Sequence, residues 1–389
     1  MSLLFFAGFD NFGGGLAGTA GGTADFPASK VGIAGTPYET QIPIIYGGAG
    51  IYNSMGVPNQ DRFRIGSGAE RRNMLVAACG GATATYFAMA RIGSGISYTI
   101  GQPFQLTIGF NICDFSSANP AGGYFAVRLC RASGTLVNLI EHIGGTSTWR
   151  LAGSPQYAFT LGQPTYVEFV IDIPTPNGSS NTFRCQVYVN GELYHTNAAL
   201  TSLTPQTTEL FFELGYDRVQ TANRYIGFSD IYLLDGAGEA PFNSRLGPQI
   251  VLPYKADSVV ASGWTPNGGT DPLTLLTDGS DTTYLTSPIG KASIDVTADL
   301  KLAPGSQVNG LAFFTRVGRD SGAPRQLVST AKRVADGTTL GAPITASTTA
   351  APGYVNSARY LPKTPAEREL LNFSDSGKVS FNISSEQSG

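Results

Sequence analysis

The sequence is poor in charged residues. Asp, Glu, Lys and Arg make up only 14% of its 389 residues, whereas an average soluble domain has roughly 25%. The net charge is −3, so there is no positive field to attract nucleic acid or an acidic lipid surface. We therefore expect no nucleic-acid partner.

Long apolar runs are also missing. No stretch approaches the roughly 18 apolar residues that a membrane-spanning helix needs. The apolar start, MSLLFFAGF, lacks the basic region and the length of a signal peptide with its cleavage site. We expect a chain without a membrane span that folds in the cytoplasm in which it is made.

Histidine and cysteine are scarce. The two histidines are His142 and His195, and the cysteines, which form no C-x-x-C pair, are Cys79, Cys113, Cys130 and Cys185. Zinc sites are built from clusters of these two residue types, so the sequence predicts no metal and no cofactor. Buried, reduced thiols are the preferred interpretation of the four cysteines.

Motifs of catalysis are absent as well. The chain has no G-x-S-x-G motif and no neighbouring cysteine and histidine that would suggest an activated nucleophile. Glu168 and Asp172 share one face of a predicted strand, but four residues of strand separate them by about 13 Å. Glycosidases hold their two carboxyl groups about 5–9.5 Å apart. These observations predict that the protein is not an enzyme.

Short apolar runs are what the sequence has in abundance. Glycine (49 residues) and proline (23 residues) interrupt them throughout the chain. Runs of this kind at 104–112, 165–173, 183–189 and 225–235, bounded by turn residues, are typical of an all-β sandwich or barrel. Helices are predicted only at 69–80 and at 364–373, the second with Thr364 as its N-cap.

The chain divides at a stretch rich in turn-forming residues. Residues 235–248 are rich in turn formers and are interpreted as a linker. Short apolar runs resume after this stretch. We therefore predict two domains, a larger β domain over residues 1–238 and a smaller β-sandwich over residues 239–389.

One hairpin can be predicted in detail. The Asn-Gly pair at 190–191 is the preferred sequence of a type I′ turn, because both central positions need a positive φ. This turn would place Val187 opposite Tyr194 and Gln186 opposite His195. His195 should then lie on the polar side of the hairpin, where a solvated histidine is favoured over a catalytic one.

The strand at 165–173 alternates in the same way. Its inward face should be apolar and its outward face should meet water. The predicted inward residues are Val167, Phe169, Ile171 and Ile173, and the predicted outward residues are Tyr166, Glu168, Val170 and Asp172.

A few side chains are candidates for contact with a ligand or a partner. Aromatic rings can stack on sugars or pack against other subunits, and the candidates are Trp149, Tyr188, Trp264 and Tyr284. Asp278 and Asp281 lie in TDGSDTTY and have oxygen atoms that can bind calcium. Since the D-x-[DN]-x-[DN]-G loop is missing, an ordinary turn is the preferred interpretation of this pair.

Several longer stretches resemble known proteins. LLFFAGFDNF, QPTYVEFVIDI followed by FRCQVYVNGELYHT, and YIGFSDIYLLDG resemble the strands of concanavalin A-like, or laminin-G-like, jelly rolls. FSDIYLLDGAGEAPFNSRLGP, SGWTPNGGTDP and TDGSDTTYLTS resemble a group of tailed-bacteriophage virion proteins with the pattern D-[DI]-x-Y-x-x-D, x-F-L-G, W-T-P and D-G-D-x-T-Y. Here Ser229-Asp230 replaces the more usual Asp-Asp, and Arg245-Leu246-Gly247 replaces Phe-Leu-Gly.

The resemblance implies a fold and a role. The fold is a concanavalin-like jelly-roll sandwich over 1–238, followed by a smaller β-sandwich domain. The role is that of a structural or adhesive virion protein, in the tail tip or a tail fibre, that contributes to host attachment. A capsid decoration or head-fibre protein, and a glycan-binding module or glycan hydrolase, are the alternatives.

The implied partners are other virion proteins, a host surface glycan and further copies of this chain. A trimer is implied by resemblance to phage fibres and spikes. The glycine-rich stretch at 13–25 is expected to be ordered by contacts from a neighbouring subunit, because glycine loses the most entropy on ordering.

Overall fold

The structure is a computed structural model of all 389 residues. The residues that it describes are 3–7, 44–47, 63–64, 71–72, 75–79, 88–96, 104–114, 123–131, 134–173, 181–203, 210–215, 224–236, 245–252, 254–277, 282–288, 290–303, 306–318, 325–347, 353–362, 364–373 and 377–387. The glycine-rich stretch at 13–25 lies outside them.

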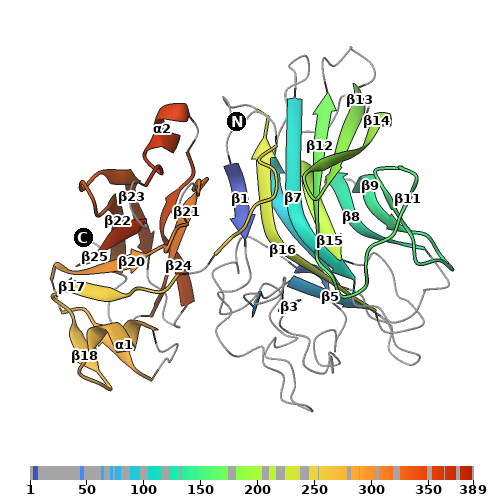
Figure 1. The fold of residues 1–389 in the computed structure, drawn as a ribbon. Coiled ribbons are helices and arrows are strands. Elements are labelled where there is room, and N and C mark those ends of the chain that lie inside the picture. Colours follow the sequence, from blue (N-terminus) through green and yellow to red (C-terminus); the bar gives the residue numbers. More distant parts are fainter. Residues whose placement is uncertain are drawn as a thin grey trace. The chain divides into compact units, whose positions relative to one another are not determined.

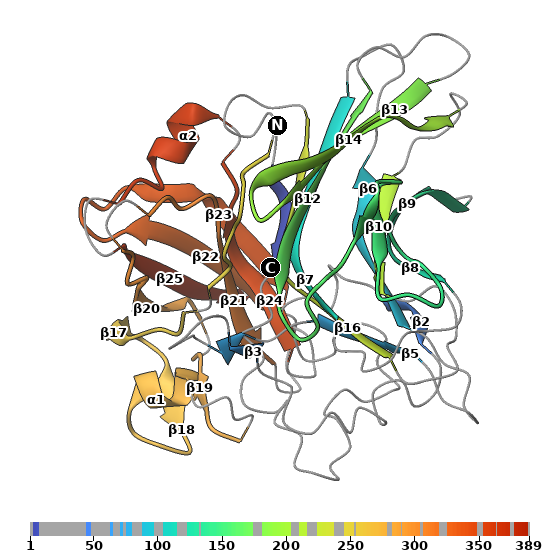
Figure 2. The same cartoon turned by 45° about the vertical axis from the view of Figure 1, so that its right-hand side comes forward.

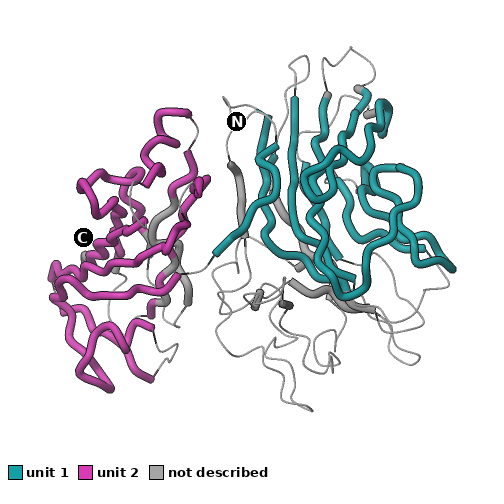
Figure 3. The backbone as a smooth tube through the Cα atoms, in the orientation of Figure 1, with its two compact units in different colours: residues 1–34, 38–252 teal, residues 35–37, 253–389 magenta. Residues whose placement is uncertain are grey.

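The chain forms two compact units, and the boundary falls between Leu252 and Pro253 (Figure 3). The predicted boundary at 238/239 was therefore too early. The physical reason is that residues 245–252, which were interpreted as the end of a linker and the start of the second domain, are hydrogen-bonded to the strands of the first unit.

The first unit consists of two seven-stranded sheets (Figures 1 and 2). Sheet I has the order β1 (Leu3–Ala7), β16 (Arg224–Asp235), β7 (Phe104–Asp114), β12 (Thr165–Ile173), β13 (Asn181–Val189) and β14 (Glu192–Leu203), and β5 (Leu75–Cys79) also pairs with β16. Sheet II has the order β11 (Gln156–Tyr157), β10 (Trp149–Leu151), β9 (Gly134–His142), β8 (Tyr124–Arg131), β15 (Leu210–Gly215), β6 (Ala88–Ile96) and β2 (Ile44–Gly47). A short ribbon joins β3 (Phe63–Arg64) to β4 (Arg71–Arg72).

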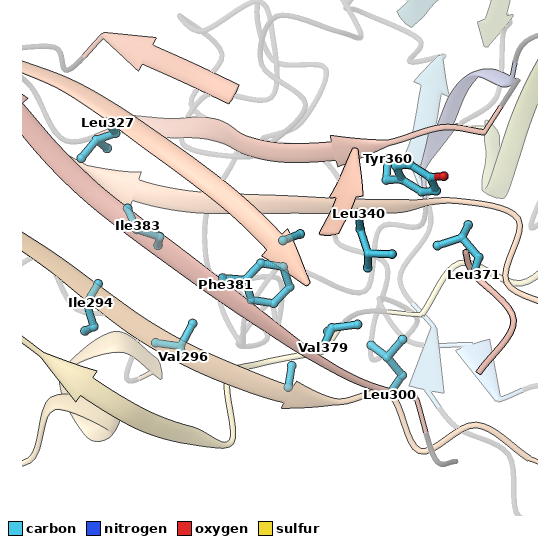
Figure 4. Close-up of a cluster of buried hydrophobic side chains, with 12 residues drawn as sticks. Ile294, Val296, Leu300, Leu327, Leu340, Tyr360, Leu371, Val379, Phe381 and Ile383 are labelled. Atoms are coloured by element: carbon cyan, nitrogen blue, oxygen red, sulfur yellow. The ribbon is translucent and has the colours of Figure 1, made fainter. Parts of the chain in front are cut away.

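The second unit is built on a five-stranded sheet, sheet III. Its order is β17 (Ser258–Ser262), β20 (Ala292–Asp299), β25 (Lys378–Gln387), β22 (Arg325–Arg333) and β23 (Thr339–Ser347). The remaining elements are the ribbons β18 (Thr265–Asn267) with β19 (Tyr284–Thr286) and β21 (Leu311–Val317) with β24 (Gly353–Tyr360), and the helices α1 (Pro272–Thr277) and α2 (Pro365–Glu369). Alternate residues of β20 and β25, including Val296, Phe381 and Ile383, form its apolar core (Figure 4).

The prediction of an all-β protein with jelly-roll-like sandwiches is confirmed. The helix at 364–373 is also confirmed in part, since α2 begins after Thr364, whose hydroxyl accepts a hydrogen bond from the Glu367 N–H. The helix predicted at 69–80 was wrong, because this stretch contains β4 and β5. Its alternation of small and apolar residues suits a strand beside β16 as well as it suits a helix.

The thiols of the described cysteines are buried and free, as predicted. Burial is the main cause that raises the pKa of Cys113 and Cys185 far above the usual value for a thiol. Burial and the neighbouring charge of Glu213 raise the pKa of Cys130 to about 12. The side chain of Cys79 lies outside the described residues.

The faces of β12 depart from the prediction in one important respect. Val167, Phe169 and Ile171 are buried, as expected, but so are Tyr166, Glu168 and Val170 on the opposite face. Glu168 has no solvent exposure at all. The alternation correctly separated the two faces, but it did not show that the outward face of sheet I is covered.

Candidate functional site: a strap held on the outer face of sheet I

A β-bulge in β16 shapes the outer face of sheet I, which is the face that carries Tyr166 and Glu168. The register with β7 shifts between Ser229 and Tyr232, and Asp230 adopts a left-handed φ of 49°. Aspartate tolerates this conformation better than most residues do. The Asp230 carboxylate is buried, and it accepts hydrogen bonds from Asn111 Nδ2 at 2.7 Å and Ser229 Oγ at 3.3 Å. The bulge thus fixes a buried carboxylate beside β7.

Glu168 lies in the same face, two strands away. Gly109 on β7 pairs with Glu168 on one side and with Tyr232 on the other. A Cβ atom at Gly109 would overlap the Tyr232 ring and lie 2.6 Å from Tyr166 Oη. Only glycine at this position allows both tyrosine rings to lie across β7. The Tyr232 hydroxyl can then donate a hydrogen bond to Glu168 Oε1.

An extended segment, residues 245–252, lies on this face, and we call it the strap. Its backbone is held by side chains of sheet I. The Leu246 N–H donates to Tyr232 Oη at 3.1 Å, and the Gly247 N–H donates to Glu168 Oε1 at 2.9 Å.

Two further hydrogen bonds hold the strap. Tyr166 Oη donates to the Gly247 carbonyl at 2.8 Å, and the Val251 N–H donates to Asp230 Oδ1 at 2.8 Å. Gly247 has a φ of 75°, a conformation that favours glycine. Every one of these bonds satisfies a polar group that would be costly to bury alone.

Arg245 closes one end of the strap. Its Nη1 lies 2.8 Å from Glu168 Oε2, and its Nη2 donates to the Gly191 carbonyl at 3.0 Å. The guanidinium also lies over the ring of Tyr188, with 3.9 Å between Cζ and the ring centroid. This is within the range of a cation–π interaction. Arg245 therefore joins β12 to the turn between β13 and β14.

The acid–base behaviour of the site follows from its burial. Burial, followed by the neighbouring negative charge of Glu168, raises the pKa of Tyr166. Burial likewise raises the pKa of Tyr232 well above its usual value, and the interactions with Tyr166 and Glu168 add to this. Burial lowers the pKa of Arg245, but the hydrogen bond and the charge of Glu168 outweigh it, so that the pKa rises. Both phenols and the guanidinium therefore keep their protons at neutral pH.

The hairpin under Arg245 has the predicted turn. Asn190 and Gly191 have φ values of 50° and 90°. The Asn190 side chain accepts from the Tyr166 N–H at 3.1 Å, and the Asn190 N–H donates to the Tyr166 carbonyl at 2.8 Å. The turn is thereby joined to β12 beside the strap.

The predicted register of the hairpin was wrong beyond the first two pairs. A bulge makes Val187 the partner of His195, so Gln186 faces Thr196 instead. Val187 is fully buried, and His195 therefore shares the inward face rather than the polar face. His195 is half-buried there. The predicted placement of His195 on the polar side was wrong, because the turn fixes register only as far as the bulge.

The predicted aromatic contacts do not form one site. Trp149 is buried between Phe159 and the stacked pair of Tyr124 and His142, which contradicts a surface role for it. Tyr188 is half-buried under Arg245.

In the second unit, Trp264 packs against the apolar core, which contradicts a free ring at this position. Tyr284 is 47% exposed, and its hydroxyl accepts from Asn267 Nδ2 at 2.9 Å. Asp278 and Asp281 lie outside the described residues. Tyr284 therefore stays a candidate contact, and Trp264 lies at the other end of the β18–β19 ribbon.

Sequence reasoning considered Glu168 only as one of a pair of carboxylates, and it did not bring together the residues that form this site: Gly109, Tyr166, Glu168, Tyr232 and Arg245. Periodicity alone gave no signal for them. The one available signal was the departure from the phage pattern at Arg245, which stands where phenylalanine is usual. The guanidinium lies over the Tyr188 ring.

The described residues offer little else for chemistry. They contain no group of three or more His, Cys, Asp or Glu side chains that could bind a metal ion. Within the same ranges, no helix is long and apolar enough to cross a membrane. The site described above is a set of hydrogen-bond acceptors and donors that bind the backbone of the strap.

Comparisons with known proteins agree at the level of fold. No family model matches the chain, and no curated protein matches it. Among solved structures, an alginate lyase of polysaccharide lyase family 7 aligns with a TM-score of 0.29 and 13% identity, covering 44% of this chain and 82% of the lyase. An endo-β-1,4-glucuronan lyase from Trichoderma reesei aligns with a TM-score of 0.31 and 10% identity, covering 44% of this chain and 84% of the lyase.

A cellulose-induced protein aligns over 54% of this chain and 94% of its own, with a TM-score of 0.31 and 12% identity. These similarities concern the fold alone. Two of the three are polysaccharide lyases, so the fold is compatible with an enzyme, and the prediction that the chain is not an enzyme is withdrawn. Glu168 itself, which the sequence placed on the outward face of a strand, is buried among tyrosines and an arginine.

Proposed function

We propose that this chain is a structural and adhesive protein of a tailed-phage virion, placed in the tail tip or a tail fibre. One observation carries the proposal. In the stretches that resemble phage virion proteins, Tyr232 of β16 and residues 245–247 of the strap bind one another or bind Glu168, and Asp230 of β16 binds the Val251 N–H of the strap. The shared pattern therefore marks a piece of architecture rather than a catalytic motif.

The architecture suits a protein in which the first unit anchors the chain that leads to the second unit. The strap is the last segment of the first unit, and the second unit begins at Pro253. A strap fixed by hydrogen bonds to buried side chains of sheet I makes the first unit a firm base up to Val251. Other virion proteins, a host surface glycan and further copies of the chain are the partners in this proposal, with a trimer as the assembly.

Immunogold labelling of particles of the encoding phage tests the proposal. Antibody against the chain should label the tail. Label on the head shell would favour the capsid alternative, and particles that lack the protein would refute a virion role. Because lyases share its fold, the purified chain should also be incubated with uronate polysaccharides, with ultraviolet absorbance of unsaturated products as the readout. Cleavage would add a catalytic role to the adhesive one.

A further inference from the structure

We propose that the outward face of the β18–β19 ribbon binds an uncharged sugar ring, which stacks on Tyr284. The ribbon belongs to the second unit and lies beside α1 (Figure 2). The inference rests on the adhesive role in the proposed function, and it assigns the glycan contact of that role to one surface of the chain.

The ribbon has an inward and an outward face. Pro266 pairs with Leu285 at its centre, and Leu285 packs against the apolar core of the second unit. Because side chains alternate along a strand, the residues on either side of this central pair point away from the core. These outward residues are all exposed: Thr265, Asn267, Tyr284 and Thr286. The core thus fixes the ribbon from one side and leaves an aromatic ring, an amide and two hydroxyls on the other.

Tyr284 is held in place without being buried. It is 47% exposed, and its hydroxyl accepts a hydrogen bond from Asn267 Nδ2 at 2.9 Å. Gly268 follows with a φ of 82°, and a Cβ atom at this position would lie 2.9 Å from Thr283 Cγ2. Glycine therefore lets the chain turn close to Thr283 directly after Asn267. Since a hydrogen bond already orients the tyrosine, less side-chain freedom is lost when a ligand binds.

The groups on the outward face match the chemistry of a sugar. The hydrogen bond to Tyr284 uses one N–H of Asn267, whose second N–H can donate and whose amide oxygen can accept, and the Tyr284 hydroxyl can donate. Sugar hydroxyls both donate and accept, and the C–H groups of a pyranose ring form an apolar surface that packs on an aromatic ring. Binding sites for small ligands combine aromatic rings with a few oriented polar groups in this way.

The lack of charge on the ribbon decides the class of sugar. Residues 265–267 and 284–286 contain no charged side chain. Lys255 and Asp271 bind the two ends of α1. Carboxylates and phosphates are bound most strongly by arginine and lysine, and the strands of the ribbon contain neither. A neutral sugar therefore suits this face better than a uronate or a phosphorylated sugar.

Saturation-transfer NMR on the full chain tests the inference. The probes are the methyl glycosides of glucose, galactose, mannose and N-acetylglucosamine, with methyl glucuronide as the charged comparison. At least one neutral glycoside should receive saturation from the protein, and methyl glucuronide should receive less. Tyr284→Ala should weaken the binding about tenfold, which corresponds to the loss of about 1.4 kcal/mol of stacking, whereas Tyr284→Phe keeps the ring and should retain most of it.

The matched control is Tyr254→Ala, at another exposed tyrosine of the second unit, and it should bind as the wild-type chain does. Equal binding by Tyr284→Ala and the wild-type chain would overturn the inference, as would stronger binding of methyl glucuronide or no binding of any neutral glycoside. If Tyr284→Ala weakened attachment of particles to cells while no glycoside bound, the face would contact a protein and the inference would also be wrong.

These outcomes are distinct from those that test the proposed function. A chain that labels the tail but does not bind sugar through Tyr284 would refute this inference and leave the proposed function standing. Sugar binding through Tyr284 by a chain that is absent from virions would refute the proposed function and leave the ribbon site standing.

Discussion

The two units differ in what they bury. Among the described residues, the buried carboxylates, Glu168, Glu213 and Asp230, all lie in the first unit. In the second unit, the described polar residues that are buried are Ser329, Ser384 and Ser385. Its core is otherwise apolar. The stability of the first unit therefore depends on polar groups that pair in one arrangement, whereas the stability of the second unit depends on the area of apolar surface that it buries.

The buried carboxylates of the first unit have partners that explain their burial. Glu213 Oε2 lies 2.7 Å from Arg128 Nε and accepts from the Cys130 thiol. Glu168 binds Arg245 and the backbone of the strap. Buried carboxylates are tolerated only with such partners. Removing one partner should cost the first unit far more than a conservative apolar change costs the second.

The largest effect is expected for Glu168→Ala. This change removes the acceptor of Tyr232, Arg245 and the Gly247 N–H, so unfolding of the first unit should become easier by about 3–5 kcal/mol. Urea denaturation measures the loss. Glu192→Ala, at an exposed residue of β14 in the same sheet, is the control and should change stability by less than about 0.5 kcal/mol. Equal effects of the two variants would show that the site contributes nothing.

Gly109→Ala should have the next largest effect. The new methyl group would overlap the Tyr232 ring and lie 2.6 Å from Tyr166 Oη, and such overpacking costs about 1–3 kcal/mol. Gly263→Ala in the second unit is the matched control, because its nearest contact, Ser293 O, lies 3.3 Å from the new Cβ. Its cost should stay below about 1 kcal/mol. Thermal denaturation of both variants compares the units directly, and the reverse order would contradict the comparison.

A conservative change in the second core should matter less. Ile383→Val removes one methylene-sized group from the apolar cluster around Phe381, and the expected loss is about 1 kcal/mol. Glu168→Gln, which keeps the size of its side chain in the first unit, should cost more because Arg245 loses its counter-ion. If Ile383→Val proved the more harmful of the two, the contrast between polar and apolar dependence would be wrong.

The smallest effect concerns pH and Cys130. Its pKa is about 12 in the folded protein and near 9.0 otherwise, so only the unfolded chain loses this proton between those pH values. Stability should therefore be complete below about pH 9 and fall as pH rises, by about 1 kcal/mol near pH 10. Urea denaturation at pH 8 and pH 10 measures this loss, and Cys130→Ala should lose less. An equal loss in both proteins would assign the pH dependence to other groups.

Local patterns predicted the strands well but did not predict what covers them. The alternation in β12 and the Asn190-Gly191 turn follow from backbone geometry, and both are present. The burial of Glu168 depends on the strap, which is 77 residues further along the chain. Periodicity contains no information about such a contact, because it describes only how neighbouring residues alternate.

Bulges limited the prediction in a similar way. One extra residue in β14 moved His195 to the inward face, and the bulge at Asp230 created the site for the strap. Bulges change which face a side chain occupies without a strong mark in the sequence. The fold class could therefore be predicted, whereas the candidate site required the structure.

Hydrogen exchange at the strap tests the central claim most directly. The claim is that Glu168, Tyr232 and Asp230 hold the strap backbone on sheet I. The amides of Leu246, Gly247 and Val251 should exchange slowly in the wild-type protein, and at least about tenfold faster in Glu168→Ala for Leu246 and Gly247, because each 1.4 kcal/mol of lost local stability gives a factor of ten. Amides that exchange in the wild-type protein as fast as those of an unstructured peptide would contradict the account.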